Sequence, residues 1–344
     1  TETLGRISGY GGRTHTPIID EDQVIISFMN SSFGPQGRGA HRFLSMNKHT
    51  GELQWWSSPA GPPQDTTYAV PVVAVVNGER LLIAAAGDGA VYAMRVRTGE
   101  TVWSFQLSKR GLNSSVVVDG YKVYATHSEE NHDSTSMGRV VCIDARGQGD
   151  VTETHEIWRQ DDITAGYASP VLNAGRLYVM NNSGVLYCYD AEKGQEIWRY
   201  TVERVSKGSP VWADGKLYIP TVNGTFTILE DLGDEARLLD SVTFESDKGG
   251  VELFGSPAVS DGRVVFFTTE EIVCLGAKDA GRQAVHLPET PSETPGDPNA
   301  PPASIQVRPA EILTAPGEKT QFKVVAFDAK GRPLGDVDNV TWSY

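Results

Sequence analysis

The chain has 344 residues, of which 39% are hydrophobic, and its formal net charge is −14 at pH 7. An acidic surface of this kind repels phosphate backbones and therefore excludes nucleic acid as an expected partner. The three cysteines, Cys142, Cys188 and Cys274, form no CxxC spacing, which excludes a zinc ribbon and a c-type haem site, and no apolar run of 18 residues predicts a membrane span.

Six copies of one hairpin pattern follow one another along the chain. Each copy has an apolar strand, a tight turn containing Asp, Asn or Gly, and a second apolar strand. The predicted hairpins cover residues 15–27, 69–85, 113–126, 168–180, 208–220 and 255–268. A third strand, a turn and a fourth strand follow each hairpin, at 41–56, 89–105, 138–160 and 184–200 and, in degraded copies without Trp, at 224–242 and 270–287. The sequence thus predicts an all-β protein built from four-stranded units.

The spacing of the units identifies the architecture. Equivalent positions at residues 17, 71, 115, 170, 210 and 257 are 54, 44, 55, 40 and 47 residues apart. Units of four strands and about 40–50 residues are typical of β-propeller blades. The longer units carry insertions at 30–40 and 127–138, between the second and third strands. Both insertions are therefore expected on the same face.

A tryptophan near the end of most units predicts how the blades pack. Trp103, Trp158 and Trp198 lie on fourth strands, where a large ring fills the wedge between blades and its indole N–H finds a nearby carbonyl. The preceding glycines, such as Gly99, permit the turn.

The composition changes after residue 278. Residues 280–302 form a Pro-rich, extended linker, and residues 303–344 alternate strongly between apolar and polar positions. This last part resembles the first half of a bacterial immunoglobulin-like domain. We therefore predict a propeller at 1–279, a linker at 280–302 and a partial immunoglobulin-like sandwich at 303–344.

The turn motif resembles that of the pyrroloquinoline-quinone-like propeller family, which includes the outer-membrane assembly lipoprotein. The family's motif of Asp, three residues, Gly, three residues and Trp matches as Asp190, Gly194 and Trp198. Gly99 and Trp103 match more weakly, with Arg95 in place of Asp. The resemblance covers residues 13 to about 279 and implies a parent propeller of seven or eight blades, of which six are visible. The first eight residues are expected to come from an upstream blade or, alternatively, to complete the last one.

The resemblance implies two kinds of function. Quinoprotein dehydrogenases of the family have an adjacent Cys pair, a catalytic Asp and ligands for calcium, whereas other members are non-catalytic. No Cys–Cys pair occurs here, and the three cysteines recur at the same third-strand position, which favours packing. We expect a non-catalytic, periplasmic or secreted scaffold of the cell envelope that binds envelope or extracellular proteins and needs no cofactor. Alternatives are a dehydrogenase using pyrroloquinoline quinone with calcium, and a carbohydrate-binding or polysaccharide-acting propeller.

Candidate ligand-binding residues lie just before the first strand of each unit. The residue three before each aligned position is Thr14, Tyr68, Leu112, Tyr167, Lys207 or Phe254, and His15 and Asn113 are neighbours. First strands line the axis of a propeller, so His15, Tyr68, Asn113, Tyr167, Lys207 and Phe254 are predicted to form a ligand floor around it. Alternatively, the aromatic rings plug the channel or pack between blades.

One acidic segment is a candidate metal site. Residues 127–133 (HSEENHD) contain His127, Glu130, His132 and Asp133, which combine imidazole and oxygen ligands. Alternatively, the segment is a solvated acidic loop.

Overall fold

The fold is all-β. A computed structural model describes residues 16–29, 40–247, 249–276 and 291–343. These residues contain no helix, and so none that is long and apolar enough to cross a membrane. The predicted strand pairs are confirmed as antiparallel hairpins, joined by tight turns at residues such as Asp214 and Gly215 whose φ angles are positive.

The first three blades each have four strands. Blade 1 consists of β1 (Ile18–Asp20), β2 (Gln23–Met29), β3 (His41–Asn47) and β4 (Leu53–Ser57). Blade 2 consists of β5 (Val72–Val76), β6 (Glu79–Ala85), β7 (Ala90–Arg95) and β8 (Thr101–Gln106). Blade 3 consists of β9 (Val117–Asp119), β10 (Lys122–Glu130), β11 (Met137–Asp144) and β13 (Glu156–Asp161).

The next three blades repeat this order. Blade 4 consists of β14 (Val171–Asn173), β15 (Arg176–Met180), β16 (Val185–Asp190) and β17 (Glu196–Thr201). Blade 5 consists of β18 (Val211–Ala213), β19 (Lys216–Pro220), β20 (Thr225–Asp231) and β21 (Ala236–Thr243). Blade 6 has β24 (Ala258–Ser260), β25 (Arg263–Phe267) and β26 (Ile272–Gly276) among the described residues. Its expected fourth strand falls within residues 277–290, outside them.

The remaining strands extend or flank the blades. The short β12 (Gly149–Asp150) pairs in parallel with β8 and makes blade 2 five-stranded. A hairpin of β22 (Glu245–Ser246) and β23 (Gly249–Gly250) follows β21. The C-terminal strands β27 (Ser304–Arg308), β28 (Lys323–Phe327) and β29 (Pro333–Asp336) form a separate antiparallel sheet.

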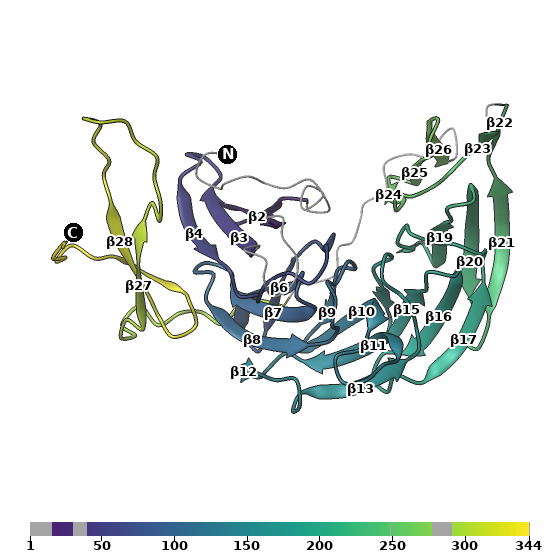
Figure 1. The fold of residues 1–344 in the computed structure, drawn as a ribbon, viewed down its shortest axis with the longest axis horizontal. Helices are drawn as coiled ribbons and strands as arrows, with labels where there is room; N and C mark the ends of the chain where they lie inside the picture. Colours follow the sequence, from purple (N-terminus) through teal and green to yellow (C-terminus); the bar gives the residue numbers. More distant parts are fainter. Residues whose placement is uncertain (1–15, 30–39, 248, 277–290, 344) are drawn as a thin grey trace.

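The six blades follow one another along an open arc, with blade 1 at one end and blade 6 at the other (Figure 1). The fourth strands, such as β13, β17 and β21, lie on the outside of the arc. The first strands of neighbouring blades contact one another on the inside, as β14 and β18 do. This is the expected propeller arrangement, in which the first strand lies nearest the axis. The prediction that the first eight residues belong to an upstream or the last blade concerns residues outside the described part.

The apolar core lies between the blades. Because strand side chains alternate between two faces, consecutive residues of one strand pack against different neighbours. In blade 3, Val123 packs in a cluster shared with blade 2, whereas Tyr124 packs in a cluster shared with blade 4. Such a cluster joins each adjacent pair of blades. Each blade is therefore stabilised by the next one along the arc.

The predicted insertion at 127–138 is an extension of the blade 3 hairpin. β10 continues to Glu130 and β11 begins at Met137, with a register irregularity between His127 and Glu130. Most of the segment expected as a loop thus belongs to paired strands or their turn. The insertion at 30–40 lies almost wholly outside the described residues.

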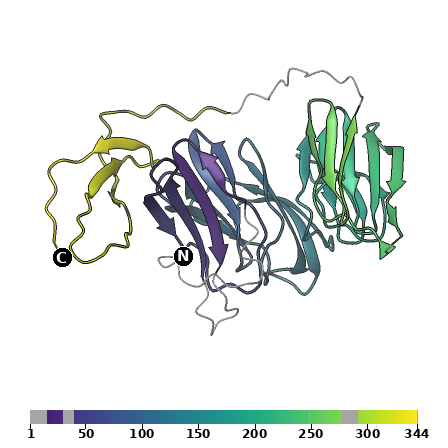
Figure 2. The same cartoon turned by 90° about the horizontal axis from the view of Figure 1, so that it is seen from above.

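The linker and the C-terminal sheet pack on blades 1 and 2 (Figure 2). The backbone N–H of Thr294 donates a hydrogen bond of 3.0 Å to the carbonyl of Gly78. The N–H of Ala310 donates one of 2.8 Å to the carbonyl of Leu53 on β4. The three-stranded sheet accordingly finds partners for part of its backbone on the propeller. Its assignment to an immunoglobulin-like domain stays a prediction.

Candidate functional site

A row of serines joins the first strands of neighbouring blades. The hydroxyls of Ser115, Ser169, Ser209 and Ser256 each accept a hydrogen bond of 2.9 Å from the backbone N–H of the preceding blade. The N–H of Val70 donates to Ser115. The N–H groups of Ser115, Ser169 and Ser209 then each donate to the hydroxyl of the serine in the next blade. Every bond has the same length and the same direction around the arc, so this serine row holds blades 2 to 6 in one register near the axis.

The candidate ligand residues form a second row beside the serines. Tyr68, Asn113, Tyr167, Lys207 and Phe254 each lie two positions before a member of the serine row or its equivalent, Val70. Side chains two apart in an extended chain point to the same side. We call this set the axial row, and the face on which the chain enters each first strand the axial face.

The aromatic rings of the axial row are open to solvent. Tyr68, Tyr167 and Phe254 are 37%, 45% and 44% exposed. Large aromatic side chains are usually covered, and three of them at equivalent positions of one surface indicate a contact site. The predicted ligand floor and the alternative that these rings plug the channel or pack between blades both stay predictions.

Lys207 lies between two of the rings. Its Nζ is 5.5 Å from the ring centroid of Tyr167 and 5.4 Å from that of Phe254. An ammonium at this distance is attracted by the negative face of each ring. The two rings thereby hold the cation in place while leaving its N–H groups available to an anionic partner.

Blade 3 enters the row one residue later than the sequence alignment predicts. The sequence alignment matches Ser115 with Pro170, but in the structure Ser115 is equivalent to Ser169. Both hydroxyls accept a hydrogen bond from a backbone N–H of the preceding blade. Leu112 is fully buried, and Asn113 instead occupies the row position. Asn113 Oδ1 accepts a weak hydrogen bond of 3.4 Å from Thr66 Oγ1. His15 and Thr14 lie outside the described residues.

The motif tryptophans connect one blade with the next. Trp103 Nε1 donates to the carbonyl of Ala145 at 2.9 Å, and Trp158 Nε1 donates to the carbonyl of Ala191 at 3.0 Å. Both acceptors lie in the turn after the third strand of the following blade. Trp198 Nε1 donates to Asp231 Oδ1 at 3.1 Å, at the end of the third strand of blade 5. These indoles act in packing and have no exposed face for a ligand.

The motif Asp and Gly shape the turn that receives the indole. Asp190 Oδ1 accepts hydrogen bonds of 2.9 Å from the backbone N–H groups of Glu192 and Lys193. Gly194 has a φ of 68°, and a Cβ there would lie 2.4 Å from Trp158 Cδ2. Gly99 receives Trp55 of blade 1 in the same way. The glycine is thus needed by the tryptophan of the preceding blade as well as by its own turn.

The structure does not gather the candidate metal ligands of segment 127–133. No group of three or more His, Cys, Asp or Glu side chains within the described ranges is placed to hold a metal. Asp133 instead accepts hydrogen bonds of 2.7 and 2.8 Å from Arg139 and Arg159. His132 and Glu130 are exposed.

His127 is buried rather than available as a ligand. Its Nδ1 accepts a 3.2 Å hydrogen bond from the backbone N–H of Glu129, and its Nε2 has no hydrogen-bond partner among the described residues. Burial, together with the nearby Arg139 cation, lowers the pKa of His127 to about 4. The imidazole is therefore neutral at physiological pH.

The described cysteines do not form the adjacent pair that quinoprotein dehydrogenases of the family have. Cys142 and Cys188 are fully buried on β11 and β16 of different blades, and burial raises the pKa of both thiols to about 12. Cys274 is exposed on β26. The alternative of a dehydrogenase that uses pyrroloquinoline quinone with calcium stays a prediction.

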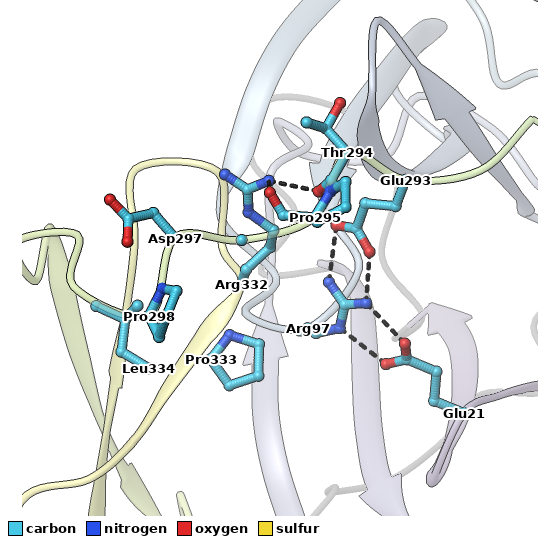
Figure 3. Close-up of a pocket in the computed structure, with 11 residues that line it drawn as sticks. Glu21, Arg97, Glu293, Thr294, Pro295, Asp297, Pro298, Arg332, Pro333 and Leu334 are labelled. Carbon is cyan, nitrogen blue, oxygen red and sulfur yellow. Dashed lines mark hydrogen bonds and ion pairs between the residues drawn. The ribbon is translucent and has the colours of Figure 1, made fainter.

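A polar cavity of about 420 Å³ lies between the linker and the propeller (Figure 3). At its wall Arg97 makes two forked ion pairs, with Glu21 of blade 1 and Glu293 of the linker, at 2.6 to 3.0 Å. Arg332 donates to the carbonyls of Thr294 and Pro295. Because the charged groups at this junction already bind one another, we assign it to docking of the C-terminal sheet.

Sequence reasoning missed the serine row and Arg97. The recurring Ser–Pro pairs at 169–170, 209–210 and 256–257 are a signal for the serine row, since each serine begins its blade. Nothing in the sequence marks Arg97, because its two carboxylate partners are 76 and 196 residues away.

Comparison with known families identifies the chain. The family model described as outer membrane protein assembly factor BamB matches residues 8–157 and again residues 136–331. The chain belongs to this family. The second match continues past residue 279, where we expected the propeller to end.

Two solved structures align with the chain. The computationally designed Ika8 protein aligns with a TM-score of 0.54 at 12% identity, over 78% of this chain and 69% of that one. BamB from Moraxella catarrhalis aligns with a TM-score of 0.46 at 12% identity, over 76% and 84%. At such identity a structural likeness concerns the fold alone, and the family assignment rests on the family model. No curated protein matches the chain.

Proposed function

We propose that this chain is a non-catalytic, protein-binding propeller of the bacterial cell envelope, and that the axial face is its binding surface. The exposed axial row carries the proposal. The chain belongs to a family whose description is outer membrane protein assembly factor BamB. This membership supports a protein-binding function and a periplasmic or secreted location. The proposal extends to envelope or extracellular proteins as partners, with no cofactor.

The chemistry of the axial row suits a peptide segment. Rings exposed by 37–45% provide apolar contact, and Lys207 adds a cation in their middle. Aromatic residues are enriched in protein interfaces because they contribute a large contact area at a low entropic cost. The complementary ligand is a carboxylate, from an Asp, a Glu or a chain terminus, flanked by apolar side chains.

Carbohydrate binding is the second candidate, favoured by the same exposed rings. A sugar stacks on the free face of an aromatic ring. Lys207 lies over one face of both Tyr167 and Phe254, which leaves fewer free faces for stacking. This geometry favours the peptide ligand over the saccharide.

A photo-crosslinking experiment tests the proposal. A photoreactive phenylalanine analogue replaces Tyr167 in the axial row or, as the matched control, Asp214 in the exposed turn between β18 and β19. Each protein is irradiated with solubilised envelope proteins. We expect discrete protein adducts at position 167, lost on Lys207→Glu and on competition with unmodified chain, and none at position 214.

The contrary results are equally specific. Identical adducts at both positions would show non-specific contact and contradict the proposal. Absence of adducts combined with saturable saccharide binding that Tyr167→Ala abolishes would favour the carbohydrate alternative. Calorimetric titration with pyrroloquinoline quinone and calcium tests the dehydrogenase alternative. Stoichiometric binding, followed by reduction of a dye in the presence of an alcohol or a sugar, would establish it.

A further inference from the structure

The outer strand of blade 5 departs from the other blades. In blades 1 to 4 a tryptophan pairs with the third-strand residue just before a bulge, as Trp198 pairs with Cys188. In blade 5 the same register places Asp240 opposite Ile228. Asp240 is exposed. β21 therefore lacks the indole that anchors the outer strands of blades 1 to 4.

β21 instead exposes apolar side chains. Leu238 and Val242 are each 48% exposed, and Leu239 is also open to solvent. On β17, which has the equivalent place in blade 4, the positions that correspond to Leu238 and Ser241 carry Glu196 and Arg199, which form an ion pair. Charged side chains on outer strands discourage pairing with other chains. β21 has no charged side chain at either of these two positions.

The outer edge of β21 is open for pairing. β21 is the last strand of its sheet, and no strand within the described residues pairs with its outer side. The chain itself shows that such an edge accepts another strand, because β12 pairs with the outer side of β8. The backbone N–H of Val151 continues that pairing with a 2.9 Å bond to the carbonyl of Ser104. The eight residues of β21 offer a longer edge than the six of β8.

The charge around β21 defines the partner. Residues 234–247 contain five Asp or Glu and a single Arg, and this Arg237 is already paired with Glu230. Such an edge attracts basic side chains and repels acidic ones. It also disfavours a second copy of this chain, whose net charge is −14.

We propose that the free edge of β21 binds an extended segment of a partner protein, in which apolar residues alternate with Lys or Arg, as an added strand. Backbone hydrogen bonds along the edge contribute the affinity, and Leu238 contacts the apolar side chains on one face of the sheet. Val242 lies on the other face with Asp240 and contacts the aliphatic stems of the Lys or Arg side chains. Asp240 and its acidic neighbours select the basic side chains. This surface is separate from the axial row, so the proposal does not depend on the function proposed above.

A synthetic peptide series tests the proposal with the whole chain. The probe is an eight-residue peptide alternating Val and Lys, titrated by fluorescence anisotropy. Its controls are the Val and Glu counterpart and the same Val and Lys sequence with every second backbone nitrogen methylated. We expect each control to bind roughly tenfold more weakly or less, because one loses the charge complement and the other the backbone bonds.

Variants locate the binding surface. The double substitution Leu238→Ser with Val242→Ser is expected to weaken binding roughly tenfold, and Asp240→Lys to weaken it and reduce its salt dependence. Ile157→Ser on β13, another exposed outer strand, and Lys207→Ala in the axial row should change nothing. Circular dichroism verifies the fold of each variant. Amide exchange should slow in residues 236–243 when the peptide binds.

Three outcomes would overturn the proposal. The first is equal binding of the methylated peptide, and the second is protection of amides elsewhere than β21. The third is a dimer of the free chain, seen by sedimentation, that dissociates on the double Leu238 and Val242 substitution, since a second copy would then be the occupant.

Discussion

Gly194 of blade 4 lies directly against the indole of Trp158 of blade 3. A Cβ at Gly194 would approach Trp158 Cδ2 to 2.4 Å, and the residue also has a φ of 68°. Gly51 has the same turn position in blade 1 and a φ of 75°, but nothing lies within 4 Å of its ideal Cβ. The pair separates the packing role of this glycine from its conformational role.

We expect Gly194→Ala to destabilise the fold more than Gly51→Ala. The Gly51 substitution incurs the left-handed backbone strain alone, about 1 kcal/mol, whereas the Gly194 substitution adds displacement of a buried indole, about 1–3 kcal/mol more. Urea denaturation of both variants measures the difference in the free energy of unfolding. Equal losses would show that Trp158 does not need the glycine.

Replacement of one serine in the serine row should loosen two blades. Ser209→Ala removes the acceptor for the N–H of Ser169, and we expect a loss of about 1 kcal/mol in the free energy of unfolding. Ser256→Ala should cost less, because Ser256 is exposed and water replaces the lost bond. Denaturation of both variants checks the order, and a larger loss at Ser256 would contradict the account of the row.

His127 should make the stability depend on pH. Its pKa is about 4 in the folded chain and 6.5 for a solvated histidine, so the unfolded chain binds the proton more tightly between these values. The free energy of unfolding therefore rises with pH between about 4 and 6.5, and His127 contributes about 3 kcal/mol to this rise. His127→Asn is expected to flatten this dependence in denaturation series from pH 4.5 to 7.5. His132→Asn, at an exposed position, should retain the dependence, and a similar effect of both substitutions would contradict the assignment.

Arg97 should control the docking of the linker. Its hydrogen bonds to Glu21 lower the pKa of that carboxyl, so the ion pair persists at neutral pH and is lost as pH falls through the lowered pKa of Glu21. We expect Arg97→Gln to speed amide exchange at Thr294 and Ala310, whose N–H groups bond to blades 2 and 1. Arg199→Gln removes an exposed ion pair on β17 and serves as control. Unchanged amide exchange at Thr294 in the Arg97 variant would show that the ion pairs of Arg97 do not hold the linker.

Most of the fold could be predicted because it depends on local spacing. The hairpins, the third strands and the Trp-bearing fourth strands recur with periods that a chain records directly, and the structure confirms them as blades. The axial row could be predicted in part. Tyr167 and Lys207 follow from their place before a first strand. Asn113 was predicted only as a neighbour of Leu112, and the Ser115 hydrogen bond shows that Asn113 has the equivalent position in blade 3.

The sequence by itself determined the repeat, the strand pairs and the absence of an adjacent cysteine pair, because each depends on neighbours in the chain. The tertiary structure decided which side chains meet across blades. It placed Lys207 between Tyr167 and Phe254, Arg97 between Glu21 and Glu293, and Asp240 where other blades dock a tryptophan. The contacts of Lys207 and Arg97 join residues 40 to 196 positions apart, and the choice of partner at that separation depends on how the blades stack rather than on any local pattern.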